Sequence, residues 1–261
     1  MGGTSNMTNK QKKLGIIQTR GLGDIVIALP IAKHFHDEGY LIYWPVTETW
    51  VEQLQHHAPY IKWIPITPDQ GAFFYDIPYE RLKNFNVDEI ICLYQSLTGH
   101  PEFTQVPWFQ HVGFDEYKYL ISGVPFRKKW TLNECITRDL AREQALFDKI
   151  IGTDASPYVV THLNASHSTA EIDPAIIPPE YRVIPITPEG YIFDWLTIID
   201  RAEAIVMTDS VMSNLTDQLG LGTDRYFVPL NHIQLTPTFG NVWTWIDNVK
   251  LNPHVRIFQS S

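Results

Sequence analysis

The sequence has few cysteines and no long apolar run, and both absences narrow the class of protein. Only two cysteines, Cys92 and Cys135, occur in 261 residues, too few for a disulfide framework or a cysteine-type zinc site. This number is typical of a reducing compartment, so we expect a cytoplasmic location. No stretch approaches the roughly 18 apolar residues of a membrane span, and the first dozen residues are polar and lysine-bearing, unlike a signal sequence.

Positive charge is also scarce. Lysine and arginine number 20 against 29 aspartates and glutamates, which gives a formal net charge of −9. This balance argues against a protein that coats nucleic acid, because phosphate neutralisation needs clustered cations. Two small basic groups, Lys10/Lys12/Lys13 and Arg127–Lys129, leave a local contact with a polyanion open. The apolar fraction of 44% is enough for a sizeable core.

What the sequence does contain is an alternation of short apolar runs and helical patterns. A buried strand over Leu14–Gln18 leads through the Arg20–Gly23 loop into a helix over Asp24–His36. Further strands are predicted over 39–46, 61–66 and 87–94, and further helices over 47–58 and 77–85. This order indicates a parallel sheet covered on both faces.

The alternation restarts in the second half of the chain. A long amphipathic helix over Asn133–Ile151 precedes the turn cluster "GTDASP". A strand that runs into a polar loop is then predicted over 158–166. Further strands are predicted over 181–187, 204–209 and 224–230, and helices over 191–202, 210–220 and 241–249. We therefore expect two successive Rossmann-like α/β domains, at residues 13–150 and 151–261.

The loop "GLGD" is the first candidate site. It leaves a parallel strand and opens a helix, where backbone amides and the helix dipole attract anions. A dinucleotide fingerprint needs a third glycine, but that position is Val26, and the carboxylate of Asp24 would repel a pyrophosphate. Asp24 is then either an N-cap of the helix or a functional acid, and both readings stay open.

Polar residues at later strand ends form the second candidate site. In "VMTDSVMSNLTDQLG", Asp209 and Ser210 end a strand and Asn214 lies on the following helix; hydroxyls and free amides at this place suit nucleotide phosphates, or they cap the helix. Asn164 and Ser166 follow another strand. Glu189 could bind a ribose diol. No compact His/Asp set has the spacing of metal ligands, so we expect no metal.

The segment from Gln95 to Trp130 is rich in aromatic residues, among them Trp108. These rings either pack against the sheet or form an acceptor-side wall, since sugars and bases stack on aromatic faces. Composition does not decide between the two.

Together, the two candidate sites resemble a known family. "GLGDIVIALPIAKHF" is similar to the amino-terminal signature of glycosyltransferases related to the lipopolysaccharide heptosyltransferases, which are ADP-heptose transferases. "VMTDSVMSNLTDQLG" is similar to the carboxy-terminal signature, D-S-G-x-x-H-x-A-x-x-L-G, with Val211 in place of the glycine and Asn214 in place of the histidine. The resemblance implies a GT-B fold, two Rossmann-like domains facing a cleft.

The resemblance also implies roles for individual residues. It implies an inverting, metal-independent transfer in which Asp24 is the general base and the nucleotide-sugar is a co-substrate rather than a cofactor. Gly21 and Gly23 would give the substrates room, and Arg20 and Trp108 would contact the acceptor. The residues expected to bind the donor are Asn164, Ser166, Glu189, Asp209, Ser210 and Asn214.

Alternatives stay open at this point. A sugar-nucleotide epimerase or hydrolase of the same fold fits the same motifs. A non-catalytic nucleotide-sugar-binding module fits the replacements at Val211 and Asn214. A third alternative keeps the transferase and makes a modified DNA base the acceptor, using Arg20 and Arg127–Lys129. The donor sugar, its nucleotide, the acceptor and the oligomeric state are not given by the motifs.

Overall fold

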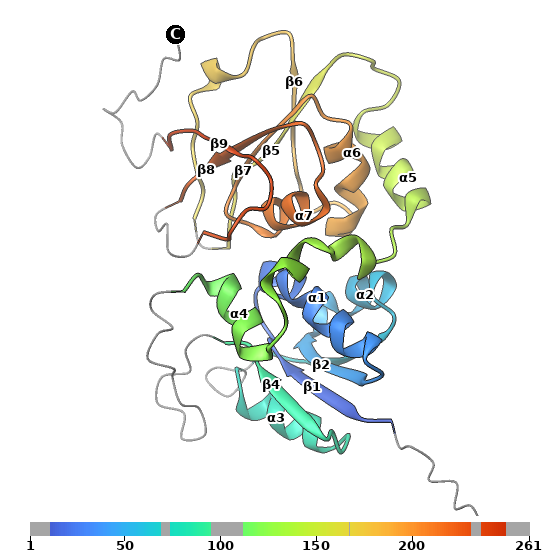
Figure 1. Cartoon of the computed structure of the whole chain (residues 1–261). Coiled ribbons are helices and arrows are strands. Elements are labelled where there is room, and N and C mark those ends of the chain that lie inside the picture. The colour runs from blue at the N-terminus through green and yellow to red at the C-terminus, as the bar shows by residue number, and fades with distance from the viewer. Residues whose placement is uncertain (1–10, 69–73, 95–111, 167, 231–235, 249–261) are drawn as a thin grey trace, which may run out of the picture.

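The computed structural model describes residues 11–68, 74–94, 112–166, 168–230 and 236–248, and they form two parallel sheets (Figure 1). The first sheet has the order β3-β2-β1-β4. Its strands are β1 (Lys13–Ile17), β2 (Leu41–Thr47), β3 (Ile61–Ile66) and β4 (Glu89–Cys92). Every pairing in it is parallel. The alternation of strands and helices predicted for this half is confirmed.

The second sheet has the order β6-β5-β7-β8-β9, again with parallel pairing. Its strands are β5 (Tyr158–His162), β6 (Arg182–Pro185), β7 (Ala204–Thr208), β8 (Asp224–Val228) and β9 (Thr244–Trp245). The predicted α/β class with two Rossmann-like units is therefore confirmed. The division at residue 150 stays a prediction.

Helices connect and cover these strands. The α-helices are α1 (Leu22–Asp37), α2 (Glu48–His57), α3 (Asp76–Lys83), α4 (Phe114–Ser122), α5 (Leu140–Ile150), α6 (Leu196–Asp200) and α7 (Val211–Leu219). Short 3-10 helices are η2 (Phe126–Trp130), η3 (Leu132–Glu134), η4 (Pro174–Ile176) and η5 (Ile192–Trp195). Among the described residues, no helix is long and apolar enough to cross a membrane.

Helix α1 is buried along its middle, from Ile25 to Ala32. A helix that is apolar all round must be covered on every side. One side of α1 covers the first sheet and another contacts α7 of the second half (Figure 1). As a result, one buried apolar cluster contains residues of both sheets, such as Leu14 of β1 and Phe227 of β8.

The predicted helix over 133–151 begins later than expected, at Leu140. Asp139 is its N-cap, and the side chain of Asp139 accepts a hydrogen bond from the amide of Arg142. Helix α5 then packs against the second half of the chain, where Arg142 pairs with Asp194 and Glu143 accepts from Thr197.

The helix predicted over 241–249 is wrong, because this segment contains the short strand β9. The carboxylate of Asp217 in α7 accepts hydrogen bonds from the amides of Gly240 and Asn241 at 2.9 and 3.0 Å, and from the indole of Trp243 at 3.0 Å. The indole of Trp130, in the first half of the chain, donates to the same carboxylate at 2.8 Å. These bonds hold the segment extended and tie it to both halves.

Candidate active site

The two loops with sequence motifs meet where α1 and α7 begin. Each helix follows the carboxyl end of a parallel strand, β1 or β7, and in parallel α/β sheets that edge is where ligands bind. A Cβ added to Gly23 would lie 3.4 Å from Cα of Val211 and 3.6 Å from Nδ2 of Asn214. We call this contact between the N-terminal ends of α1 and α7 the seam.

Asp24 lies in the first turn of α1 and is not its N-cap. Gly21 is the N-cap, with a φ of 74° that side-chain-bearing residues rarely adopt. A Cβ on Gly21 would also clash with Oδ2 of Asp24. The glycine therefore leaves the space that one carboxylate oxygen of Asp24 occupies. The capping interpretation of Asp24 is wrong, and its carboxylate is available for another role.

A buried lysine holds the other oxygen of Asp24. Nζ of Lys118, in α4, lies 2.9 Å from Oδ1 of Asp24; the lysine side chain is 4% exposed and that of Asp24 is 33% exposed. The same ammonium donates to Oε1 of Gln18 at 3.1 Å. Sequence reasoning did not select Lys118, because it lies in the aromatic segment between the two motifs.

Tyr94 fixes the loop that precedes α1. Its phenol oxygen accepts hydrogen bonds from the amides of Thr19 and Arg20 at 2.9 and 3.0 Å. The guanidinium of Arg20 lies 5.1 Å from the centre of the Phe74 ring, and the side chain of Arg20 is exposed. Tyr94 ends a predicted strand but carries no motif that would have identified it.

On the other side of the seam, Ser210 is the N-cap of α7. Its hydroxyl accepts from the amide of Ser213 at 3.4 Å and lies 3.0 Å from Nδ1 of His162, at the end of β5. Burial lowers the pKa of His162 to about 4, so the ring is neutral at pH 7. The capping interpretation of Ser210 is confirmed, and the neutral ring adds no charge to the site.

Asp209 directly precedes that cap. Burial raises the pKa of Asp209 to about 7, and the negative charges of Asp24 and Asp115 act in the same direction, whereas Lys129 opposes them. A carboxyl group with this pKa exists in both protonation states near neutral pH. Asp24 and Asp209 therefore form a pair of acids whose environments differ: one has a lysine partner, the other is kept partly protonated.

Asn214 is the third polar residue on the α7 side of the seam. Its Nδ2 donates to the carbonyl of Ser210 at 2.9 Å, while its Oδ1 is buried with no hydrogen-bond partner among the described residues. The residue is 4% exposed and lies against Gly23. We call the residues at the seam with polar side chains the seam cluster: Asp24, Lys118, Asp209, Ser210 and Asn214.

Two predicted donor-binding residues make their contacts elsewhere, and a third is exposed. Oδ1 of Asn164 accepts from Thr169 at 3.0 Å within its own loop, and Ser166 is exposed. Glu189 forms an ion pair with Lys149 of α5. Neither of these contacts involves the seam cluster. Trp108 lies outside the described residues.

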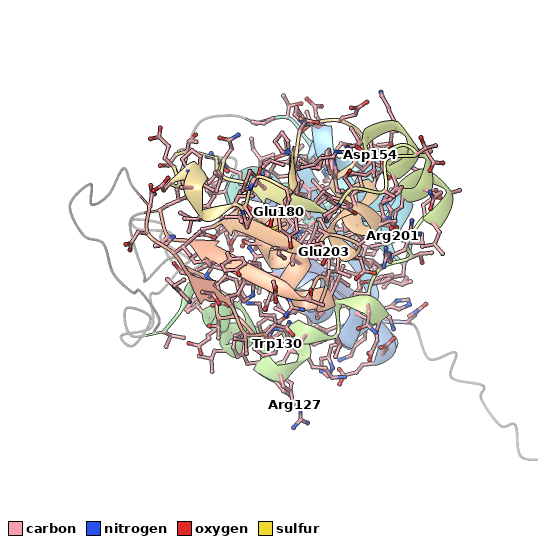
Figure 2. The ribbon with its side chains drawn as sticks, turned by 90° about the horizontal axis from the view of Figure 1, so that it is seen from above. Arg127, Trp130, Asp154, Glu180, Arg201 and Glu203 are labelled. Carbon is pink, nitrogen blue, oxygen red and sulfur yellow. The ribbon has the colours of Figure 1, made fainter. Side chains whose placement is uncertain are left out.

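The basic group Arg127–Lys129 does not form a surface patch. Lys129 is fully buried, with Nζ 2.7 Å from Oδ2 of Asp115. Arg127 points away from the body of the molecule into solvent (Figure 2). The lysine that would have strengthened a nucleic-acid contact is thus used inside the protein, and the DNA-base alternative loses that support.

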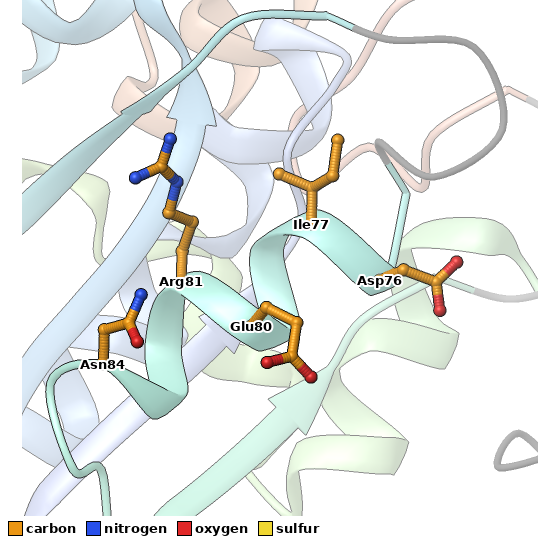
Figure 3. A pocket seen from close by; sticks show the side chains of 5 residues that line it. All are labelled: Asp76, Ile77, Glu80, Arg81 and Asn84. Carbon is orange, nitrogen blue, oxygen red and sulfur yellow. The ribbon is translucent and has the colours of Figure 1, made fainter.

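The described residues contain neither a metal-binding cluster nor a pocket that indicates a second functional site. In the part of the chain that the structure describes, no group of three or more histidine, cysteine, aspartate or glutamate side chains could hold a metal ion. One pocket lies on α3 and is lined by Asp76, Ile77, Glu80, Arg81 and Asn84 (Figure 3). A second, mainly apolar pocket lies beside β5 and β6. Neither pocket contains a predicted site residue.

Two parallel α/β units whose motif-bearing strand ends meet at a shared seam define the GT-B type of fold, which glycosyltransferases use. Solved structures agree with this assignment. A glycosyl transferase family 9 protein from Veillonella parvula is similar with a TM-score of 0.61 and 12% identity, over 90% of this chain and 87% of that one.

Two Escherichia coli enzymes are also similar in structure. Heptosyltransferase WaaC, solved with ADP, has a TM-score of 0.52 at 14% identity, over 90% of this chain and 93% of that one. ADP-heptose lipopolysaccharide heptosyltransferase II has a TM-score of 0.51 at 13% identity, over 90% of each chain. No family model and no curated protein matches the sequence. The likeness is therefore one of fold.

Proposed function

We propose that the chain is a glycosyltransferase that moves a sugar from a nucleotide-sugar donor to an acceptor hydroxyl, with inversion and without a metal. The observation that carries the proposal is the position of Asp24: a part-exposed carboxylate at the seam, held by a buried lysine through one oxygen only. A fixed carboxylate next to a substrate hydroxyl is suited to general-base catalysis. The fold and both sequence motifs support the same reaction class.

In this reaction Asp24 takes the proton of the acceptor hydroxyl. That oxygen forms a bond to the anomeric carbon while the bond from this carbon to the diphosphate oxygen breaks. The electron pair leaves with the nucleoside diphosphate. The N-terminal amides of α7, beyond the Ser210 cap, would face the developing negative charge, as helix N-termini do for phosphates.

The donor is expected on the α7 side of the seam. Ser210 and Asn214 supply polar groups there. Oδ1 of Asn214 has no hydrogen-bond partner in the part of the chain that the structure describes, so it could accept from a sugar hydroxyl. Asn164, Ser166 and Glu189 stay predicted donor contacts, and Arg20 and Trp108 predicted acceptor contacts. Because the WaaC structures contain ADP or ADP-2-deoxy-2-fluoro heptose, ADP-linked sugars are the first donors to test.

Asp24→Asn tests the proposal. The variant keeps the shape of the side chain and removes the base, so we expect nucleoside-diphosphate binding to persist while transfer falls at least ~100-fold. Binding is measured by calorimetry and transfer by product formation from a panel of acceptors. Asp76→Asn, an exposed aspartate on α3, is the matched control.

The same assays separate the alternatives. Consumption of the donor without an acceptor would favour a hydrolase or epimerase. Binding with no turnover on any acceptor would favour a non-catalytic module. Near-normal transfer by Asp24→Asn would remove Asp24 from the role of base.

A further inference from the structure

Two hydrogen bonds and one ion pair connect the loop before α1 to the carboxylate of Asp24. Nε2 of Gln18 donates to the carbonyl of Arg20 at 2.8 Å, which fixes the orientation of the Gln18 amide. Oε1 of Gln18 then faces Nζ of Lys118 at 3.1 Å, and the same ammonium lies 2.9 Å from Oδ1 of Asp24. Gln18 directly follows β1 and Lys118 lies on α4, so the ammonium that pairs with Asp24 is itself held by a second part of the chain.

The burial of Lys118 shows that this contact is specific. A lysine is rarely buried, because removing its charge from water is costly unless a partner compensates. Lys118 is 3% exposed as a residue, and its ammonium lies between the amide oxygen and the carboxylate. Lys118 is therefore not a surface lysine that promotes solubility. Its anionic partner is the carboxylate of Asp24 at the seam.

The other charges around Asp24 have different partners or the same sign. Lys129, on η2, bonds to Asp115 and to the carbonyl of Thr238. Asp209, from the other half of the chain, adds a negative charge to the neighbourhood of Asp24. Without Lys118, Asp24 would face Asp209 with no counter-charge at hydrogen-bond distance among the described residues.

We propose that Lys118 is a positioning residue that fixes the carboxylate of Asp24 and supplies its counter-charge, with Gln18 setting the direction of the ammonium. This inference rests on the proposed function, because it assigns a purpose to the ion pair only if Asp24 accepts a proton. Lys118 holds Oδ1, so Oδ2, on the side of Gly21, is the oxygen that receives the proton. Lys118 itself does not contact the substrate.

The test compares Lys118→Met and Lys118→Arg by the pH dependence of kcat/KM. Methionine keeps the apolar stem and removes the cation that lies beside the carboxylate of Asp24. We expect the acidic limb of the kcat/KM profile to move to higher pH. We also expect kcat at pH 7 to fall at least ~10-fold, while KM for the donor changes less than ~2-fold. Arginine keeps the charge and should return the acidic limb of the pH profile to its wild-type position.

Lys83→Met, which removes a lysine paired with Glu80 on α3, is the matched control and should leave the profile unchanged. A merely structural role predicts a different result. Lys118→Met would then lower activity only in proportion to folded protein, measured by thermal unfolding, with the acidic limb unmoved. That result, or an Arg variant as impaired as the Met variant, would overturn the inference.

A measurement that does not depend on enzyme turnover tests this inference separately from the proposed function. The carboxyl 13C signal of Asp24, assigned by its loss in Asp24→Asn, is titrated in the wild type and in Lys118→Met. We expect a higher midpoint in the variant. If the wild type transfers no sugar but the midpoint moves, the proposed function fails and the coupling stands. An unchanged midpoint refutes the coupling.

Discussion

Gly23 of α1 lies against the backbone of Val211 in α7, with 3.4 Å between Cα of Val211 and the place where a Cβ of Gly23 would stand. The first turns of two helices from different halves of the chain are thus in contact. A methyl group fits this distance as an ordinary van der Waals contact, and we expect a longer side chain to press against the first turn of α7. The size of residue 23 therefore limits how closely the two motifs approach.

Substitution of Gly23 should show this limit. Gly23→Leu forces the first turns of α1 and α7 apart, and overpacking of this kind costs about 1–3 kcal/mol of unfolding free energy. We expect a lower Tm and a loss of transfer activity. Gly23→Ala, the control, should stay close to the wild type in both assays. Wild-type activity in Gly23→Leu would mean that the seam can widen without harm.

Asp209 should make stability depend on pH. Its pKa is raised from an ordinary 3.8 to about 7, so between these values the folded state holds a proton that the unfolded state has lost. The unfolding free energy then decreases as pH rises from about 4 to about 7, and the full cost of the buried charge is present above pH 7. The cause is burial, together with the charges of Asp24 and Asp115.

Asp209→Asn removes this cost. We expect the variant to be more stable than the wild type at pH 8, by at least about 1 kcal/mol, which corresponds to about one unit of pKa shift. At pH 4 the two should differ little. Urea unfolding at both pH values measures the difference. A variant equally destabilised at pH 4 and pH 8 would show that Asp209 acts through packing and not through its charge.

Asp217 should be important for stability and not for the reaction. Its buried carboxylate accepts from Trp130, Gly240, Asn241 and Trp243, so Asp217→Asn places an amide NH₂ against donors. Loss of such partners for a buried charged acceptor costs about 2–4 kcal/mol. Denaturant unfolding should show this loss, while Asp224→Asn, at an exposed aspartate of β8, should change little. Equal effects at both positions would contradict the role of Asp217.

The fold was largely predictable because its alternation of strands and helices is regular and the buried strands are short and apolar. The error at 241–249 has a clear cause. Trp243 and Trp245 fit a helix or a strand by pattern, and the hydrogen bonds that decide come from Asp217, on a different element. Local sequence does not contain that information.

The site was predictable only in part, for a similar reason. Asp24 and Asp209 follow strand ends, and the rule for parallel sheets placed both motifs at one edge. Lys118 and Tyr94 reach the loop before α1 from other elements, so their roles depend on tertiary packing. Glu189 was selected as a carboxylate near a strand end, and its partner Lys149 could not be foreseen from spacing.

The continuous buried cluster that includes Leu14 and Phe227 has a consequence for how the chain unfolds. Two-domain proteins often melt in two steps, because each domain keeps a separate core. Here α1 packs against β2 of the first sheet and against α7 of the second half, within one buried cluster, so opening either half exposes part of the other. We therefore expect the two sheets to unfold together, because a cut between them would divide this shared apolar cluster.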